Sequence, residues 1–220
     1  MKIVLQTLNF LLRFLNRGPP KPMTFENIIS HFISLIRNPD YFTRIHKLLT
    51  YRIYFYFHPN YPWLTPQANS IIMGTLKGNE LGIEFGAGIS TLFLAERCKR
   101  LISIEDDPVW YYRVSSWLKK RVINNVSLKL IRDKEAYINE IKKVSDEYFD
   151  FILIDGSHRL EIFINALSKV KLGGFIIFDN SDSHPYKEFL DKYYTKIKEQ
   201  YIRIRTIGPL QETTFLVRKK

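Results

Sequence analysis

The stretch ELGIEFGAGIST, residues 80–91, decides the fold of this chain. Apolar residues alternate with glycine and glutamate over 81–85 and give way to Gly-Ala-Gly at 86–88, and an apolar segment with helical character follows at 92–95. This pattern predicts a buried strand, a glycine turn and the start of a helix. Such turns hold ligands, because glycine lets the backbone approach a ligand closely and the N–H groups of the next helix face it.

Two classes of ligand use such a turn, and the residues around it separate them. A dinucleotide-binding turn has the pattern G-x-G-x-x-G, whose third glycine allows close packing of helix and strand. Here Gly86 and Gly88 are present, but Thr91 takes the third position, and an acidic residue, Glu84, precedes the turn. The pattern therefore disfavours a dinucleotide. Ser90 and Thr91 are able to cap the helix or to bind the ligand.

Further apolar segments alternate with helical ones downstream of the turn and predict more strands of a parallel sheet. These strands are expected at 100–105, 126–131, 148–154 and 175–178. Polar residues end or follow them: Glu105 with Asp106, Asp133, Asp155, and Asp179 with Asn180. Because open α/β sheets bind ligands at the carboxyl ends of their strands, these separate strand ends indicate one common site.

The last part of the sequence predicts a hairpin. Segments 201–207 and 213–217 have the pattern of strands, and the turn Gly208-Pro209 lies between them. Two strands joined by so short a link must be antiparallel, because a parallel crossover needs more chain.

The N-terminal part reads as a helical extension, residues 1–60, in front of a domain of residues 61–220. Its segments are a linker at 18–22 and helices at 25–37 and 41–57. Residues 1–17 are apolar, but polar residues interrupt them, so they are too short for a membrane helix. As an amphipathic helix they would pack on the domain, pair with a second subunit in a homodimer, or make peripheral contact with a membrane.

Composition bounds the class of protein. The 220 residues are 45% hydrophobic and 15% aromatic, which indicates a folded globular chain. The net charge of +11 favours anionic partners, such as nucleic acid, a phosphorylated or sugar-nucleotide substrate, or anionic lipid. A soluble enzyme without such a partner is equally compatible with this charge. The single cysteine, Cys98, excludes an internal disulfide framework and favours a cytoplasmic location.

The stretch around the glycine turn resembles motif I of the class I S-adenosylmethionine-dependent methyltransferases. The resemblance covers residues 61–220. Its other parts are Ile104-Glu105, the sequence Asp155-Gly-x-His-Arg159, and Gly173-Gly174 with Asp179-Asn180. It implies an α/β fold, a Rossmann-like three-layer sandwich whose mostly parallel seven-stranded sheet ends in an antiparallel strand. No part of the family matches the N-terminal helical extension.

The resemblance also implies roles for individual residues. The cofactor, S-adenosylmethionine, would bind through Glu84, Phe85, Gly86, Ala87, Gly88, Ser90, Thr91, Glu105, Asp106, Asp133 and Asp155. Glu105 would accept hydrogen bonds from the ribose hydroxyls, and Asp133 would contact the adenine. Asp133 has an alternative reading as the N-cap of the helix that follows it.

A metal ion is a further implication. Asp155, Asp179 and Asn180 resemble the ligands of the magnesium-dependent O-methyltransferases of the catechol type, and hard oxygen ligands suit Mg²⁺. Many relatives with the D-G-x-H-R sequence have no established metal, so a site without Mg²⁺ is the alternative.

Methyl transfer to a hydroxyl needs a group that removes the proton of the acceptor. His158 and Asp155 are the expected catalytic residues, and His184 is a rival to His158. The sequence therefore predicts an enzyme that O-methylates a small hydroxylated acceptor, such as a sugar or sugar-nucleotide. The alternatives are an RNA methyltransferase, which the basic charge favours, and a methyltransferase-fold module that binds without catalysis.

Overall fold

The computed structural model describes residues 39–220, and the chain divides into two units, Met1–Pro59 and Asn60–Lys220. The described part of the first unit is helix α3, Pro39–Phe57, which covers the helix expected at 41–57. The expected linker, the helix at 25–37 and the amphipathic segment 1–17 lie outside the described residues. Among helices of residues 39–220, none has both the length and the apolar character of a membrane span.

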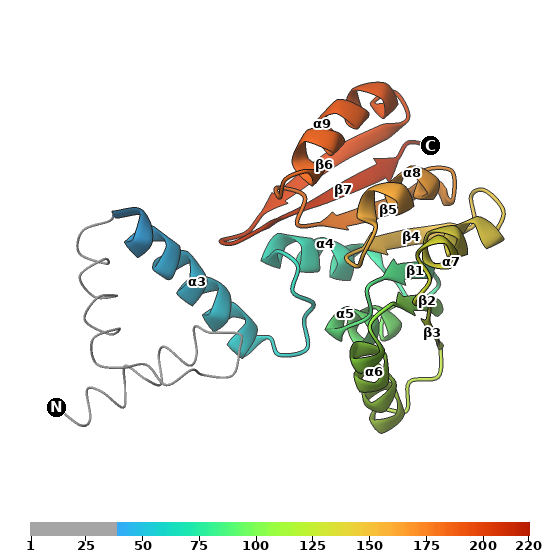
Figure 1. Cartoon of the computed structure of the whole chain (residues 1–220), viewed down its shortest axis with the longest axis horizontal. Coiled ribbons are helices and arrows are strands. Elements are labelled where there is room, and N and C mark those ends of the chain that lie inside the picture. The colour runs from blue at the N-terminus through green and yellow to red at the C-terminus, as the bar shows by residue number, and fades with distance from the viewer. Residues whose placement is uncertain (1–38) are drawn as a thin grey trace. The chain divides into compact units, whose positions relative to one another are not determined.

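A seven-stranded sheet forms the centre of the second unit, with the strand order β3-β2-β1-β4-β5-β7-β6 (Figure 1). The strands are β1 Leu81–Phe85, β2 Arg100–Glu105, β3 Val126–Leu130, β4 Phe149–Ile154, β5 Val170–Asp179, β6 Tyr201–Ile207 and β7 Glu212–Arg218. Strands β3, β2, β1, β4 and β5 each pair with the next in parallel. Strand β7 is antiparallel to both β5 and β6. The predicted mostly parallel sheet with an antiparallel strand is therefore confirmed.

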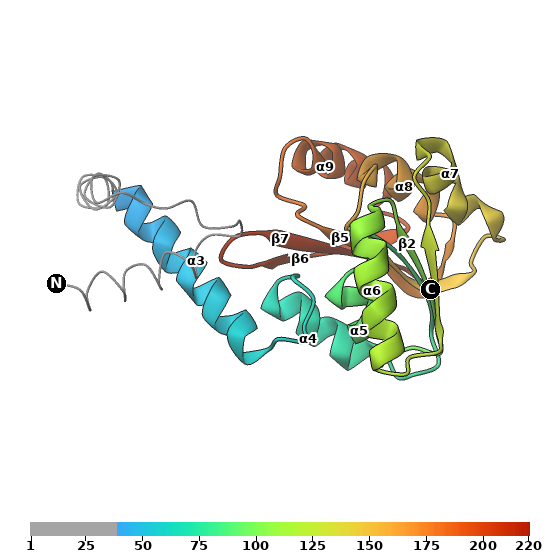
Figure 2. The same cartoon turned by 60° about the horizontal axis from the view of Figure 1, so that its bottom comes forward.

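Helices cover both faces of the sheet and complete a three-layer sandwich. They are α4 Pro66–Thr75, α5 Ile89–Ala95, α6 Pro108–Lys120, α7 Lys134–Asn139, α8 Arg159–Ala166 and α9 Tyr186–Ile197, with a 3-10 turn at Glu140–Lys143. Figure 2 shows α4, α5 and α6 on one face and α7, α8 and α9 on the other. The Rossmann-like architecture expected from the sequence is confirmed.

Strand β4 shows why the sheet is buried on both faces. Ile152 and Ile154 pack into the core that includes α7, α8 and α9, whereas Phe151 and Leu153 pack into the core beneath α4 and α5. All four side chains are fully buried. A central strand of a parallel sheet is apolar on both sides because helices cover both of its faces.

The observed elements differ from the expected ones mainly at their ends. Strand β5 begins at Val170, five residues before the expected start of the strand at 175. Its pairing with β4 shifts register between Phe149 and Phe151, so an irregular segment is included in the strand. Pairing with β4 thus extends β5 beyond the apolar run that predicted the strand.

Candidate functional site

A cleft of about 270 Å³ opens at the carboxyl ends of β1, β2 and β4. Its lining comes from the loop before α4, the glycine turn, the end of β2 with the start of α6, and the loop after β4. The lining residues are Pro62, Trp63, Gly86, Ala87, Gly88, Ile89, Ser90, Glu105, Asp106, Trp110, Asp155, Gly156 and Ser157. The ends of β1, β2 and β4 thus meet in one cleft, whereas Asp133, Asp179 and Asn180, which lie at the ends of β3 and β5, do not line it.

The glycine turn passes close to the loop after β4. Gly86 has φ +97°, and a Cβ atom at this position would lie 2.6 Å from the backbone nitrogen of Gly156. Its own N–H donates to the carbonyl of Ile104 at 2.8 Å, which ties the turn to β2. Only glycine combines this positive φ with so close an approach of two backbones.

Glu84 lies behind the turn and not on the cleft surface. Its carboxylate is fully buried and accepts hydrogen bonds from the hydroxyls of Ser90 at 2.9 Å and Ser103 at 2.7 Å. Burial raises the pKa of Glu84 to about 7, although the hydroxyl donors oppose the shift. Of these residues Ser90 lines the cleft, so Glu84 orients a hydroxyl that a ligand would meet.

Glu105 is held in place by three backbone donors at the end of β2. Its Oε1 accepts from the N–H groups of Asp106 at 3.0 Å and Asp107 at 2.9 Å, and its Oε2 accepts from Ala87 at 2.8 Å. Burial raises the pKa of Glu105, whereas these N–H groups act in the opposite direction. A carboxylate has about four lone-pair positions, so one remains on Oε2 for a hydroxyl of a ligand.

The start of α6 adds an aromatic wall to the same end of the cleft. Asp107 caps the helix by accepting from the N–H of Val109 at 2.7 Å, and Pro108 occupies the first turn. This start places Trp110 against the cleft, and the guanidinium of Arg113 lies 4.5 Å from the centre of its ring. The sequence located the helix start but gave no sign that Trp110 would face the ligand site.

Three other predicted cofactor contacts lie outside the cleft lining. Phe85 and Thr91 are fully buried, and Thr91 accepts a hydrogen bond from the N–H of Gly88 at 3.0 Å through its hydroxyl. Asp133 is exposed and caps α7, because its carboxylate accepts from the N–H of Ala136 at 2.8 Å. The structure thus shows the capping role of Asp133, and the adenine contact stays a prediction.

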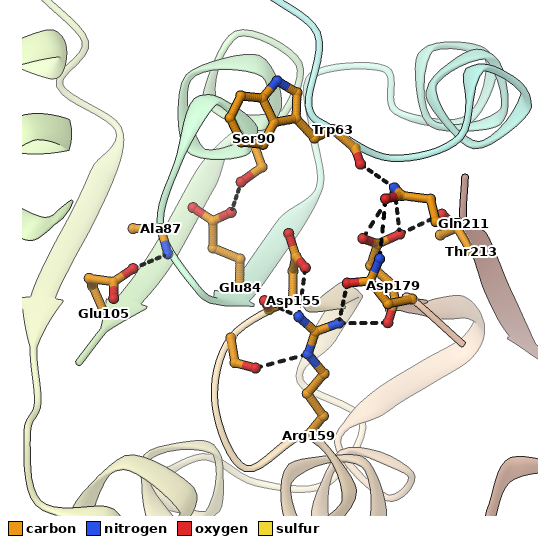
Figure 3. A network of polar contacts seen from close by, with 12 residues as sticks. Trp63, Glu84, Ala87, Ser90, Glu105, Asp155, Arg159, Asp179, Gln211 and Thr213 are labelled. Carbon is orange, nitrogen blue, oxygen red and sulfur yellow. Dashed lines mark hydrogen bonds and ion pairs between the residues drawn. The ribbon is translucent and has the colours of Figure 1, made fainter. Parts of the chain in front are cut away.

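At the other end of the cleft, Arg159 binds the residues that follow β4 and β5 (Figure 3). Its Nε donates to the carbonyl of Gly156 at 2.9 Å. Its Nη1 donates to the carbonyl of Asp179 at 2.6 Å and to Oδ1 of Asn180 at 3.2 Å. Its Nη2 donates to the carbonyl of Asp155 at 2.7 Å and to Oδ1 of the same residue at 3.0 Å.

Two carboxyl groups, those of Asp155 and Asp179, lie near this guanidinium. Asp155 lines the cleft, and a third of its side chain is exposed (33%). Asp179 is buried and accepts from the hydroxyl of Thr213 at 2.6 Å. Burial, and then the charge of Asp155, raise the pKa of Asp179 to about 8. Burial also raises the pKa of Asp155, against the opposing charge of Arg159.

The loop before α4 and the β6–β7 hairpin meet at this end of the cleft. Gln211, in the hairpin turn, donates through Nε2 to the carbonyl of Trp63 and lies 3.4 Å from both carboxylate oxygens of Asp179. Asn69 in α4 donates to the carbonyl of Pro62 at 3.1 Å. These contacts fix the loop so that the indole of Trp63, which is 50% exposed, lines the cleft (Figure 3).

The predicted ligand set for Mg²⁺ does not fit a metal ion in this arrangement. A side-chain oxygen of Asp155 and one of Asn180 each accept a hydrogen bond from Arg159. The backbone carbonyl of Asp179 also accepts one from Arg159. In the part of the chain that the structure describes, no group of three or more His, Cys, Asp and Glu residues could hold a metal. The position between these oxygens is taken by a cation of the protein itself.

Neither predicted histidine lies on the cleft lining. His158 has φ +53° immediately before α8, and its ring centre is 6.1 Å from that of Tyr137. His184 is exposed on the loop after β5, with Nε2 3.7 Å from the carboxylate of Glu188. Asp155 is therefore the predicted catalytic residue that the structure brings to the cleft.

Comparison with known proteins supports the fold but gives no sequence family. No family model and no curated protein matches the chain. Among solved structures, an rRNA methylase from Streptococcus thermophilus is 16% identical, with a TM-score of 0.59 over 70% of this chain and 95% of that one. The O-methyltransferase TomG from Streptomyces achromogenes, involved in tomaymycin synthesis and solved in complex with S-adenosylmethionine, is 17% identical. Its TM-score is 0.57, over 70% of this chain and 80% of that one.

The tRNA (m1A58) methyltransferase TrmI from Aquifex aeolicus is similar in the same way, with 15% identity and a TM-score of 0.53. The match covers 70% of this chain and 68% of that one. The names of these proteins give different methylation reactions, yet all three structures are similar to this chain. The matched part of this chain therefore shares the fold of these solved methyltransferases.

Proposed function

We propose that this protein is an S-adenosylmethionine-dependent methyltransferase that O-methylates a small hydroxylated acceptor, such as a sugar or sugar-nucleotide. The observation that carries the proposal is a single cleft with two different ends. One end has the glycine turn and the fixed carboxylate of Glu105, and the other has Asp155 beside Trp63. The first end suits a nucleoside, and the second suits a neutral hydroxylated ring.

The Glu105 end fits the nucleoside part of the cofactor. The remaining lone pair of the Glu105 carboxylate accepts from a ribose hydroxyl, and the ring of Trp110 provides an apolar surface next to it. The glycine turn leaves its backbone open to the methionine part, with the hydroxyl of Ser90 nearby. S-adenosylmethionine, when bound, supplies a methyl group on a cationic sulfur.

The Asp155 end fits the acceptor. A half-exposed indole offers a flat apolar face on which a sugar ring can pack, and a carboxylate beside it accepts from the hydroxyls of that ring. No lysine, arginine or histidine is among the described residues that line the cleft, whereas Glu105, Asp106 and Asp155 are acidic. This charge favours a neutral group in the cleft, so the phosphates of a sugar-nucleotide would lie outside it.

Asp155 is the residue we assign to proton removal. Arg159 holds the carboxylate by one oxygen, and the exposed part of the side chain faces the cleft. S-adenosylmethionine, held by the glycine turn and Glu105, would supply the methyl group to the acceptor oxygen, and its sulfur would keep the electron pair of the broken carbon–sulfur bond. The proton of the acceptor hydroxyl passes to Asp155. Alignment of oxygen and methyl carbon supplies the rest of the rate enhancement.

Isothermal titration of the full chain with S-adenosylmethionine and with NAD tests the cofactor. We expect binding of S-adenosylmethionine in the micromolar range and none of NAD. Incubation with methyl-labelled cofactor and separate pools of small hydroxyl compounds and of RNA then tests the acceptor. NAD binding without S-adenosylmethionine binding would refute the cofactor assignment.

RNA methylation is the second candidate, because the net charge of +11 suits a polyanion. Label that enters RNA and no small hydroxyl compound would establish it in place of the sugar acceptor. Binding of S-adenosylmethionine without label in either pool would instead favour a binding module.

A further inference from the structure

We infer that Arg159 is the resident cation of the acceptor end and occupies the place that a divalent metal ion would need, so that this site works without such an ion. The inference deepens the proposed function, because it concerns the same end of the cleft. It rests on the geometry of one side chain and on the oxygens around it.

The guanidinium of Arg159 has no donor left for another partner. An arginine side chain carries five N–H groups. Here they meet five acceptor oxygens, from Gly156, Asp155, Asp179 and Asn180, at distances between 2.6 and 3.2 Å. Donors and acceptors therefore match in number, and the cation is a structural part of the site.

Burial and a contact with an aromatic ring also restrict the side chain of Arg159. The residue begins α8, and its side chain is only 12% exposed. The ring of Tyr186, at the start of α9, lies 5.6 Å from the guanidinium carbon. A side chain enclosed in this way does not exchange easily between a bound and a free position.

A divalent ion would need the same oxygens. Mg²⁺ binds oxygen ligands at about 2.0–2.1 Å. Three oxygens between β4 and β5, which are Oδ1 of Asp155, Oδ1 of Asn180 and the carbonyl of Asp179, accept from Arg159. The carboxylate of Asp179 accepts from the hydroxyl of Thr213 instead. Entry of the ion between these oxygens would require expulsion of the guanidinium, which would break its five hydrogen bonds.

This arrangement bears on the class of acceptor. A metal ion at this position would chelate two neighbouring oxygens of an acceptor, whereas a guanidinium without free N–H groups binds neither. The acceptor therefore meets Asp155 through one hydroxyl, and a second adjacent hydroxyl gives no advantage. We expect compounds with an isolated hydroxyl to be as well accepted as those with a vicinal pair.

Titration of the full chain with Mn²⁺, used as the probe for a divalent ion, tests the inference. We expect no saturable binding to the wild type. Arg159→Ala exposes the three oxygens and is expected to bind one Mn²⁺, which raises its melting temperature by about 5 °C or more at 100 times the Kd. Arg159→Ala combined with Asp155→Asn should lose this binding. Arg121→Ala, which removes an exposed arginine bonded to Asn60, is the matched control and should behave as wild type.

Binding of one Mn²⁺ to the wild type that disappears in Asp155→Asn would overturn the inference. So would a folded Arg159→Ala variant that binds no Mn²⁺ at millimolar concentration. If Arg159→Ala does not fold, the wild-type titration alone decides. Because Mn²⁺ binding is measured without methyl transfer, failure here is distinct from failure to bind S-adenosylmethionine.

Discussion

Gly86 and Gly88 lie in the same turn, yet the structure gives them different roles, and substitutions separate these. A Cβ at Gly86 would meet the backbone of Gly156, whereas the nearest atom to a Cβ at Gly88 is Oγ of Ser90 at 3.7 Å. We expect Gly86→Ala to cost on the order of 2 kcal/mol of stability or more. Gly88→Leu should fold with little loss and fail to bind S-adenosylmethionine. Thermal melts and titration of both variants check this, and a stable Gly86→Ala would contradict it.

The carboxyl group of Asp179 predicts a dependence of stability on pH. Its folded pKa of about 8 lies above its unfolded value of 3.8, so the folded state binds more protons between these pH values. The free energy of unfolding should therefore fall as the pH rises from about 4 to about 8. Asp179→Asn removes this titration and keeps an acceptor for Thr213. From pH 6 to pH 9 the variant should gain in melting temperature relative to wild type.

Asp146→Asn provides the control for that comparison. Asp146 is exposed, and the pKa of its carboxyl is lowered by Lys169, so it stays ionised throughout this pH range. The melting temperature of Asp146→Asn should differ from that of wild type by the same amount at every pH from 6 to 9. An Asp179→Asn variant with the same constant offset would show that Asp179 does not titrate there.

Single residues show where prediction from sequence succeeds and where it stops. Glu105 and Asp155 were predicted because acidic residues after parallel strands reach one common edge. The difference between Ser90 on the cleft and Glu84 behind it could not be predicted, because it depends on which face of β1 meets α5. Trp63 reaches the cleft through Gln211, which is 148 positions away in sequence, so no local pattern could indicate the contact.

At the scale of elements, helix α7 gives a test of the two readings of Asp133. If the side chain is only the N-cap, Asp133→Ala should lower stability by about 1 kcal/mol, and Asp133→Ser should retain most of it. Neither variant should change the affinity for S-adenosylmethionine. Denaturant melts and titration measure both effects. Loss of affinity in both variants would establish the adenine contact instead.

Element types were predictable because apolar segments of strand length alternate with helical ones along the whole domain. The residues at which the elements begin and end were less predictable. The apolar run predicts a strand at 175–178, but pairing with β4 extends this strand back to Val170. Pairing between distant segments satisfies backbone groups in a way that local sequence does not reveal.

At the scale of the whole molecule, the described residues that form the core of the second unit all belong to that unit. The buried residues of the three described apolar clusters begin at Leu64. We therefore expect residues 60–220 alone to unfold cooperatively and to bind S-adenosylmethionine with an affinity close to that of the full chain. Calorimetry and titration of both proteins measure this. An insoluble or non-cooperative fragment would contradict it.

The position of β7 between β5 and β6 has a consequence for synthesis on the ribosome. The outer edge of β5 pairs with β7, which emerges more than 30 residues after β5 has been made. Until then the nascent chain carries an unpaired strand edge, which is prone to association with other chains. Thr213 and Gln211, the partners of Asp179, arrive with the same hairpin. The nucleoside end of the cleft can thus form during translation, whereas the acceptor end is completed only after this last strand has been added.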